Sequence, residues 1–232
     1  MPAIDIENLS FSYGDKQALK DVSIVVEEGD FTGLIGPNGS GKTTLIKNIL
    51  GFIESEKGEI EIFGEKAMDF SDWNRIGYIP QHFEEDKQFP GTVRELLEAN
   101  RSITGSTENI ESLDIDSFLD SKFKDLSGGQ KQRAMLALAL QKNPDILILD
   151  EPSLGVDVEA QENFYNLIKE LNDQGTTIIL VTHDIGVVSE HTDKVICINN
   201  SVCCQGKTEN LSKHVEEVYG DNYRLFHHMH EH

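Results

Sequence analysis

The segment at residues 36–43, GPNGSGKT, constrains the fold more than any other, because it matches the pattern G-x-x-x-x-G-K-[ST]. A short apolar run, FTGLIG, precedes it, and a run with helical periodicity, TTLIKNILG, follows it. A glycine-rich turn that arose by chance is the alternative. Glycine makes up about 7% of residues on average, so a full match between a strand and a helix is rare by chance. The sequence therefore predicts a phosphate-binding loop between a strand and a helix.

The chemistry of this loop suits a polyphosphate and its metal ion. Glycine lets backbone N–H groups wrap around phosphate oxygens, and the helix that follows adds the positive end of its dipole. Lys42 brings a point charge to the outer phosphates, and the Thr43 hydroxyl suits Mg²⁺, which prefers oxygen ligands. The predicted nucleotide-binding residues of the loop are Gly36, Pro37, Asn38, Gly39, Ser40, Gly41, Lys42, Thr43 and Thr44.

Apolar runs that read as strands alternate along the chain with runs that read as helices. The expected strands are IDIENLSFSY, VSIVVEEGD, FTGLIG, EIEIFG, RIGYIP, DILILD, TTIILVTHD and DKVICIN. The expected helices are TTLIKNILG, TVRELLEAN and VEAQENFYNLIKELNDQG. We interpret about 81–143 as a mostly helical insert between parallel strands, and the part after about 207 as a polar, helical tail. The alternation predicts a single α/β domain with a mostly parallel sheet.

Polar side chains that suit phosphate chemistry follow three of the expected strands. Asp150 ends DILILD and Glu151 directly follows it; Asp150 would hold Mg²⁺ and Glu151 would polarise an attacking water. Two acids after an apolar strand usually mark only the strand's end, but a phosphate loop in the same chain favours the functional reading. His183 ends TTIILVTH and would touch the γ-phosphate. Gln81 follows RIGYIP and would ligate Mg²⁺ or position water. Read alone, each has a plainer interpretation, a structural histidine and a solvated loop residue.

The stretch LSGGQ at 126–130 stands directly before a polar and then apolar helix-forming run. The start of a helix offers unpaired backbone N–H groups and the positive end of the helix dipole, so an anion is the expected ligand. The predicted anion-binding residues are Ser127, Gly128, Gly129 and Gln130.

Composition limits the function classes. The formal net charge of −21 opposes nucleic-acid binding, which needs clustered Lys and Arg. No apolar run approaches the roughly 18 residues of a membrane span, and the N-terminus does not read as a signal peptide, so we expect the cytosol. Cys197, Cys203 and Cys204 form an odd, late cluster that predicts no disulfide framework. We expect Cys203 and Cys204 to pack as small hydrophobes in the strand and turn after Cys197, with metal binding by these two residues as the alternative.

The order of these motifs resembles the ATP-binding subunits of ABC transporters over about residues 3–210. LSGGQ is the discriminating element, since many NTPases share a phosphate loop. The resemblance implies a P-loop NTPase fold of the ABC ATPase type. Its core sheet is mostly parallel, with an antiparallel β subdomain and a helical subdomain. It also implies ATP and Mg²⁺ as cofactors and ATP hydrolysis coupled to transport. Two copies would face each other around two ATP molecules, and LSGGQ of one copy would contact the γ-phosphate of the ATP bound to the other copy.

Further roles are implied by the resemblance alone. Tyr13 falls where an aromatic ring stacks on adenine, although it could be an ordinary strand aromatic. Glu151 becomes the general base, His183 the γ-phosphate contact, and Gln81 the link to a membrane subunit. Asp157 lies in the family's dimer-contact loop, where Leu154 stands in place of a common serine and puts a serine-dependent bond in doubt.

The chain looks most like the zinc and manganese uptake branch of the family, which implies further partners. These are an integral-membrane permease, contacted through FPGTVREL on the cytoplasmic face of the membrane, and an extracytoplasmic metal-binding protein. The tail, about 208–232, is rich in imidazoles that suit Zn²⁺: His227, His228, His230 and His232. A solvated end, a partial affinity tag and an unstructured metal trap are alternatives for the tail.

Two other functions compete with metal import. An exporter ATPase would share all the chemistry above. A soluble ABC-type ATPase acting on nucleic acid or ribosomes is opposed by the charge, by the single cassette, and by the short segment 44–125 between the two motifs, which lacks heptads.

Overall fold

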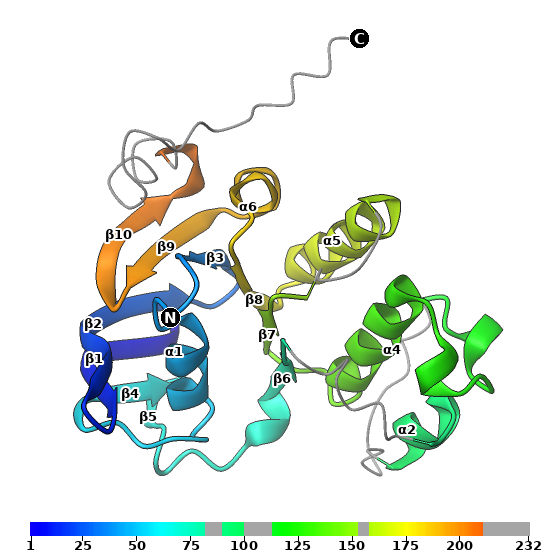
Figure 1. The fold of residues 1–232 in the computed structure, drawn as a ribbon, viewed down its shortest axis with the longest axis horizontal. Helices are drawn as coiled ribbons and strands as arrows, with labels where there is room; N and C mark the ends of the chain where they lie inside the picture. The colour runs from blue at the N-terminus through cyan, green and yellow to red at the C-terminus, as the bar shows by residue number, and fades with distance from the viewer. Residues whose placement is uncertain (82–89, 100–112, 153–157, 211–232) are drawn as a thin grey trace, which may run out of the picture. The chain divides into compact units, whose positions relative to one another are not determined.

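The structure is a computed structural model that describes residues 1–81, 90–99, 113–152 and 158–210 (Figure 1). The chain divides into two compact units. The first unit comprises Met1–Ser71 and Ile179–His232, and the second comprises Asp72–Ile178. Each unit is described by itself.

An antiparallel sheet forms one part of the first unit, with the strand order β2-β1-β4-β5. The strands are β1 (Pro2–Tyr13), β2 (Lys16–Glu27), β4 (Lys57–Ile62) and β5 (Glu65–Lys66). The second half of β2 alternates: Val22, Ile24 and Val26 are buried, and Ser23 and Val25 between them are exposed. This period of two fits a sheet with one face on the core. The predicted antiparallel β subdomain is confirmed.

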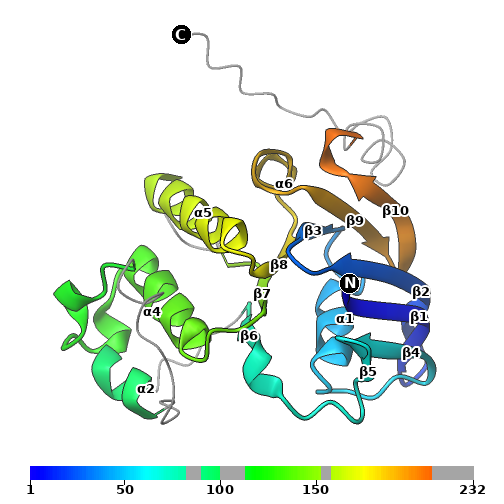
Figure 2. The same ribbon diagram turned by 180° about the vertical axis from the view of Figure 1, so that it is seen from behind.

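The rest of the first unit carries strands of a second sheet, in the order β10-β9-β3-β8. These are β3 (Phe31–Ile35), β8 (Thr177–Thr182), β9 (Lys194–Asn199) and β10 (Ser201–Lys207). β3 and β8 are buried along their whole length, as their apolar runs predict. β3 pairs with β9 in parallel, and β9 pairs with β10 in antiparallel; Figures 1 and 2 show the last two side by side. Two helices belong to this part, α1 (Lys42–Ile49) and α6 (Ile185–His191).

The cysteine prediction is wrong for one pair. Cys197 on β9 and Cys204 on β10 are register partners, with Cα atoms 4.9 Å apart, and they form a disulfide. Cys197 and Cys204 are both buried, so the packing predicted for Cys204 is confirmed. Cys203 is exposed and lies outside any disulfide, so the packing predicted for it is wrong. The sequence does not reveal the pairing because β10 has no apolar run and buries only Cys204, so the register of β10 against β9 cannot be read from the sequence.

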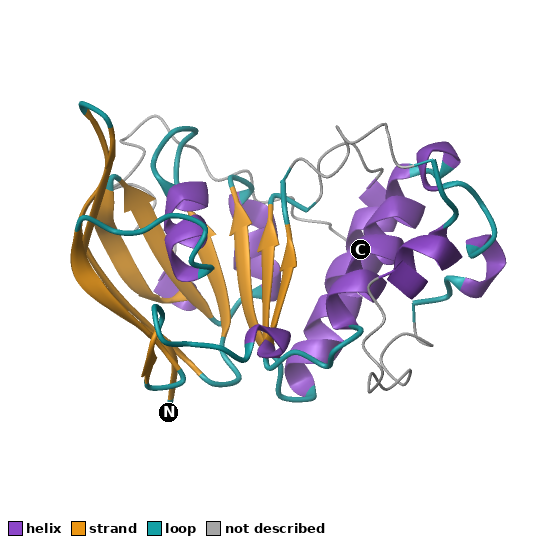
Figure 3. Ribbon diagram, turned by 90° about the horizontal axis from the view of Figure 1, so that it is seen from below, coloured by secondary structure: helices purple, strands orange, loops and turns teal. Residues whose placement is uncertain are grey.

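Two parallel strands and three α-helices make up the described part of the second unit. β6 (Ile76–Ile79) pairs with β7 (Ile146–Asp150), so a mostly parallel arrangement recurs here. Between them lie α2 (Val93–Ala99), α4 (Gly128–Leu140) and the short 3₁₀ turns Asp116–Phe118 and Phe123–Asp125. After β7 comes α5 (Val158–Asp173), and a further 3₁₀ turn, Trp73–Arg75, precedes β6. Figure 3 draws this unit mainly as helix. The described segments between β6 and β7 thus agree with a helical insert, while its limits at about 81 and 143 stay a prediction.

Sequence signals explain where these helices start and which face they bury. In α2, Thr92 and Glu95 satisfy each other's backbone N–H groups, at 2.7 Å for Thr92 N to Glu95 Oε2 and 3.2 Å for Glu95 N to Thr92 Oγ1. In α5 the buried side chains Phe164, Ile168 and Leu171 recur at helical spacing.

Candidate functional site

The predicted phosphate loop is the connection from β3 to α1 in the first unit. α1 begins at Lys42, and its N-cap is Gly41 with φ 103°, a left-handed conformation that glycine adopts without strain. The buried Lys42 ammonium donates to the carbonyl oxygens of Gly36 at 2.7 Å and Pro37 at 3.2 Å. These two hydrogen bonds hold the positive charge against the backbone of the loop.

The back of the loop leaves no room for side chains. A Cβ at Gly36 would lie 2.1 Å from the Ile198 carbonyl oxygen, and one at Gly41 would lie 2.6 Å from the Ala18 carbonyl oxygen. At Gly39, by contrast, nothing lies within 4 Å of a Cβ position. Ser40 Oγ is buried and has no hydrogen-bond partner among the described residues. The loop is thus closely packed at Gly36 and Gly41, has open space at Gly39, and contains the buried Ser40 hydroxyl. This combination fits a polyphosphate ligand.

A turn far along the sequence holds this loop in place. Asn200, between β9 and β10, donates its backbone N–H to the Ser40 carbonyl at 2.7 Å. Its side-chain amide donates to the carbonyls of Gln17 at 3.2 Å and Ala18 at 3.1 Å. Asn200 has φ 62°, which asparagine tolerates better than most residues. Sequence reasoning missed this support; the paired Asn199-Asn200 between two strands is a turn signal.

Tyr13 and His183 also lie in the first unit. Tyr13 ends β1 with its side chain 49% exposed, and its ring meets Phe11 edge-on at 4.8 Å. An exposed ring is what stacking on a base requires, so its role stays a prediction. His183 is exposed directly after β8, at the strand end that the sequence predicts. Asp184, the next residue, caps α6 through the N–H groups of Gly186 and Val187.

Asp150 and Glu151 lie in the second unit at the carboxyl end of β7. Asp150 is fully buried and Glu151 is 6% exposed. Burial and the charge of Asp150 raise the pKa of Tyr78 on β6 to about 12, so this phenol keeps its proton and can donate it in a hydrogen bond. Glu151 has φ 51°, a left-handed conformation that is uncommon outside glycine and recurs at functional sites.

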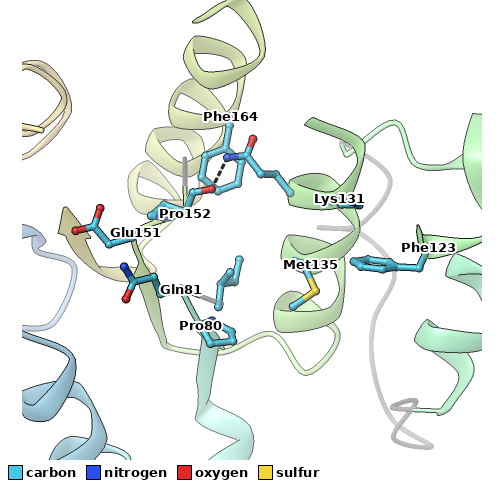
Figure 4. Close-up of a pocket in the computed structure, with 10 residues that line it drawn as sticks. Pro80, Gln81, Phe123, Lys131, Met135, Glu151, Pro152 and Phe164 are labelled. Carbon is cyan, nitrogen blue, oxygen red and sulfur yellow. Dashed lines mark hydrogen bonds between the residues drawn. The ribbon is translucent and has the colours of Figure 1, made fainter. Parts of the chain in front are cut away.

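Glu151 and Gln81 line the same cavity. Its volume is about 50 Å³, and Figure 4 shows both side chains at its edge. Apolar side chains, among them Met135 and Phe164, form much of the rest. The structure therefore brings together two of the polar residues that the sequence singles out. It also adds Gln132 to the lining, which sequence reasoning missed.

LSGGQ opens α4, as its composition predicts. Ser127 is the N-cap: its hydroxyl accepts from the Gln130 N–H at 3.3 Å, and the Gln130 side chain accepts from the Ser127 N–H at 3.0 Å. The capping box fixes the start of α4 at Ser127, which is exposed, so the N-terminal end of this helix lies at the protein surface. A Cβ at Gly129 would lie 3.1 Å from the Cβ of Ala160 on α5, so glycine permits close packing of the two helices.

The remaining predicted residues do not form a described site. The dimer-contact loop with Leu154 and Asp157, and the four tail histidines, lie outside the described residues. The structure as far as it is described holds no group of three or more His, Cys, Asp or Glu side chains suited to a metal ion. Among the described helices, none is long and apolar enough to cross a membrane.

Comparison with known sequences identifies the family. A sequence model of the ABC transporter family matches residues 19–154, which include the phosphate loop, LSGGQ and Glu151. The zinc uptake system ATP-binding protein ZurA of Listeria monocytogenes is 39% identical over 229 residues, covering 92% of this chain and 89% of its own. The zinc import ATP-binding protein ZnuC of Marinobacter nauticus is 38% identical (91% and 80% covered). A probable metal transport system ATP-binding protein of Thermotoga maritima is 36% identical (95% and 92% covered).

Solved structures agree with the sequence relatives. A nucleotide-free ATP-binding cassette from an ABC transporter superposes with a TM-score of 0.81 at 26% identity, covering 96% of both chains. A dimeric cassette in a post-hydrolysis state, bound to ADP and Pi, superposes with a TM-score of 0.74 at 29% identity, covering 88% of this chain and 98% of its own. The predicted ABC ATPase fold is thereby confirmed. The chain belongs to the ABC transporter family and is an ATP-binding subunit of such a transporter, an ATPase.

Proposed function

We propose that this ATPase powers the import of a zinc-type metal ion through a separate membrane permease. The observation that carries the proposal is the match, over nine-tenths of this chain, to proteins named for zinc uptake and zinc import. An exporter ATPase is the alternative from the sequence, and no described residue favours it.

The described residues fit the binding of ATP with Mg²⁺. We propose that the loop from Gly36 to Thr44 wraps the phosphates and that Lys42 exchanges its two loop carbonyls for phosphate oxygens. Tyr13 stacks on adenine. Thr43, Asp150 and Gln81 supply oxygen ligands to Mg²⁺, which neutralises phosphate charge when bound.

Hydrolysis then depends on a proton acceptor beside the γ-phosphate. We propose that Glu151 accepts the proton of the attacking water and that His183 contacts the γ-phosphate. Glu151 is buried, with 6% of the residue exposed, and its left-handed backbone is consistent with a functional constraint.

Coupling requires partners. We propose that two copies of this chain assemble head to tail, with Ser127, Gly128, Gly129 and Asp157 of one copy serving the ATP of the other. The N-cap of α4, Ser127, is exposed and stands at the positive end of the helix dipole, which suits this role. The permease would be contacted on the cytoplasmic face of the membrane through the segment that includes α2. An extracytoplasmic metal-binding protein would deliver the ion to the permease.

Cellular metal content tests the cargo. Total zinc, manganese and iron are measured by elemental mass spectrometry under metal limitation, in cells that lack this chain or carry it. Cells that carry the Glu151→Gln form are the matched control. A selective fall in one metal, restored only by the active form, is expected for an importer. Unchanged levels of all three metals would remove the metal assignment and leave the ATPase intact.

Gln81→Ala tests the coupling role. Gln81 directly follows Pro80 at the edge of the cavity that Glu151 also lines, so it is placed to link that cavity to the part of the chain that follows it in sequence. We expect metal-uptake-coupled ATP turnover to fall about tenfold or more, a cost in the range of a lost positioning contact, while ATP binding persists. Transport-coupled turnover equal to wild type would contradict the coupling role.

A further inference from the structure

Gln132 makes a contact that neither the family match nor the cavity alone explains. It lies on α4, two residues after LSGGQ, and its Nε2 donates to the Pro152 carbonyl oxygen at 2.5 Å; Figure 4 draws this bond as a dashed line. This distance lies below the usual range of about 2.7–3.2 Å for N–H···O bonds. Pro152 directly follows Glu151, so the bond joins the helix that LSGGQ opens to the chain that carries the proposed base.

The backbone at Glu151 needs such an anchor. A left-handed conformation at a residue other than glycine is strained and persists only where the surroundings hold it. Glu151 has φ 51°, and the next residue is a proline whose own φ is fixed by its ring. A hydrogen bond on the Pro152 carbonyl therefore restrains the chain immediately after the carboxylate.

Only one orientation of the Gln132 side-chain amide is compatible with this contact. Its Oε1 is buried and accepts no hydrogen bond among the described residues. Turning the amide over would place this oxygen against the Pro152 carbonyl oxygen, and two acceptors repel each other. The contact consequently requires a donor of glutamine's length, and an isosteric carboxylate does not replace it.

We propose that Gln132 is a positioning residue for ATP hydrolysis, which sets the direction of the Glu151 carboxylate by holding the Pro152 carbonyl to α4. The inference rests on the proposed role of Glu151 as general base. In the head-to-tail dimer proposed above, α4 starts at the ATP of the other subunit. Gln132 then links contact with one ATP to the base that acts on the second.

The chain contains a matched control on the same helix. Gln141 is the C-cap of α4, and its Nε2 donates to the Leu97 carbonyl at 2.8 Å, while its Oε1 is likewise buried with no partner in the described part of the chain. The bond type and the burial of the oxygen are alike, but Leu97 lies on α2 and not beside Glu151. A change at Gln141 reports what the loss of such a bond does to the fold alone.

The test compares Gln132→Glu, Gln132→Met and Gln141→Glu in the purified chain. Steady-state ATPase assays give kcat and KM, and thermal unfolding gives stability. We expect both Gln132 variants to lose about tenfold or more in kcat, since small displacements of a catalytic group have effects of this size, with KM within about twofold of wild type. Gln141→Glu is expected to keep kcat, whatever its melting temperature.

Each outcome decides the matter. Wild-type kcat in either folded Gln132 variant would overturn the proposal, as would an equal loss of kcat in Gln141→Glu. If Gln132→Glu does not fold, Gln132→Met removes the donor without adding a charge and takes its place. Glu151→Gln in the same assay distinguishes failure of the general-base role of Glu151 from failure of the positioning role of Gln132. Full activity of Glu151→Gln would refute the general-base role. An inactive Glu151→Gln together with fully active Gln132 variants would refute only the positioning role.

Discussion

Replacing Glu151 by glutamine is expected to abolish most ATP hydrolysis while ATP binding persists. Glutamine keeps the shape of the side chain, but its amide cannot accept a proton from water, and general-base catalysis is typically worth about 10²- to 10⁴-fold in rate. Phosphate binding would be retained, since the loop of the first unit is unchanged. Phosphate-release assays measure the rate, and analytical ultracentrifugation with ATP measures the association of two chains, which we expect to be trapped.

Glu170→Gln is the control for loss of a carboxylate. Glu170 lies on α5 in the same compact unit, and its side chain is exposed. Its substitution is expected to leave the rate unchanged. Hydrolysis by Glu151→Gln at the wild-type rate, or a variant that stays monomeric with ATP, would contradict the assignment.

Gly36→Ala is expected to prevent nucleotide binding and to destabilise the fold. The added Cβ would lie 2.1 Å from the Ile198 carbonyl oxygen, a backbone atom of β9, and 2.7 Å from Ser40 Oγ. No side-chain rotation relieves a clash with backbone, so β9 or the loop must move. Overpacking of this kind costs about 3 kcal/mol of the free energy of unfolding. Denaturant titration and nucleotide-binding measurements check both effects.

Gly29→Ala separates crowding from backbone strain. Gly29 has φ 80° and no atom within 4 Å of a Cβ position. Its substitution therefore adds strain without a clash, about 1–2 kcal/mol, and ATP binding should persist. Equal stability losses at the two glycines, or normal ATP binding by Gly36→Ala, would show that the close packing behind the loop is not needed.

The sequence predicts those parts of the protein whose structure is determined by residues close together in the chain. The phosphate loop, β3, α1 and the buried strand β7 each follow from a run of neighbouring residues, and the structure has all four. The start of α4 at LSGGQ follows in the same way from the sequence. These features depend on caps, apolar runs and glycines that lie within one stretch of chain.

The features that the sequence does not reveal depend on pairing between distant segments. β10 carries few buried side chains, so neither the strand nor the Cys197–Cys204 pair is visible before the register with β9 is known. Gln132 reads as an ordinary polar helix residue until its contact with Pro152 is seen. Asn200 reads as a turn residue, although it supports a loop about 160 positions earlier.

The support that Asn200 gives to the phosphate loop has a consequence for biosynthesis. The loop leaves the ribosome early, with residues 36–44, but its neighbours in the structure come late: Ile35 is the register partner of Cys197, and Ser40 receives its hydrogen bond from Asn200. Contacts so distant in sequence form only after the whole intervening chain is available. The nucleotide site is thus among the first motifs to be translated and among the last to be completed.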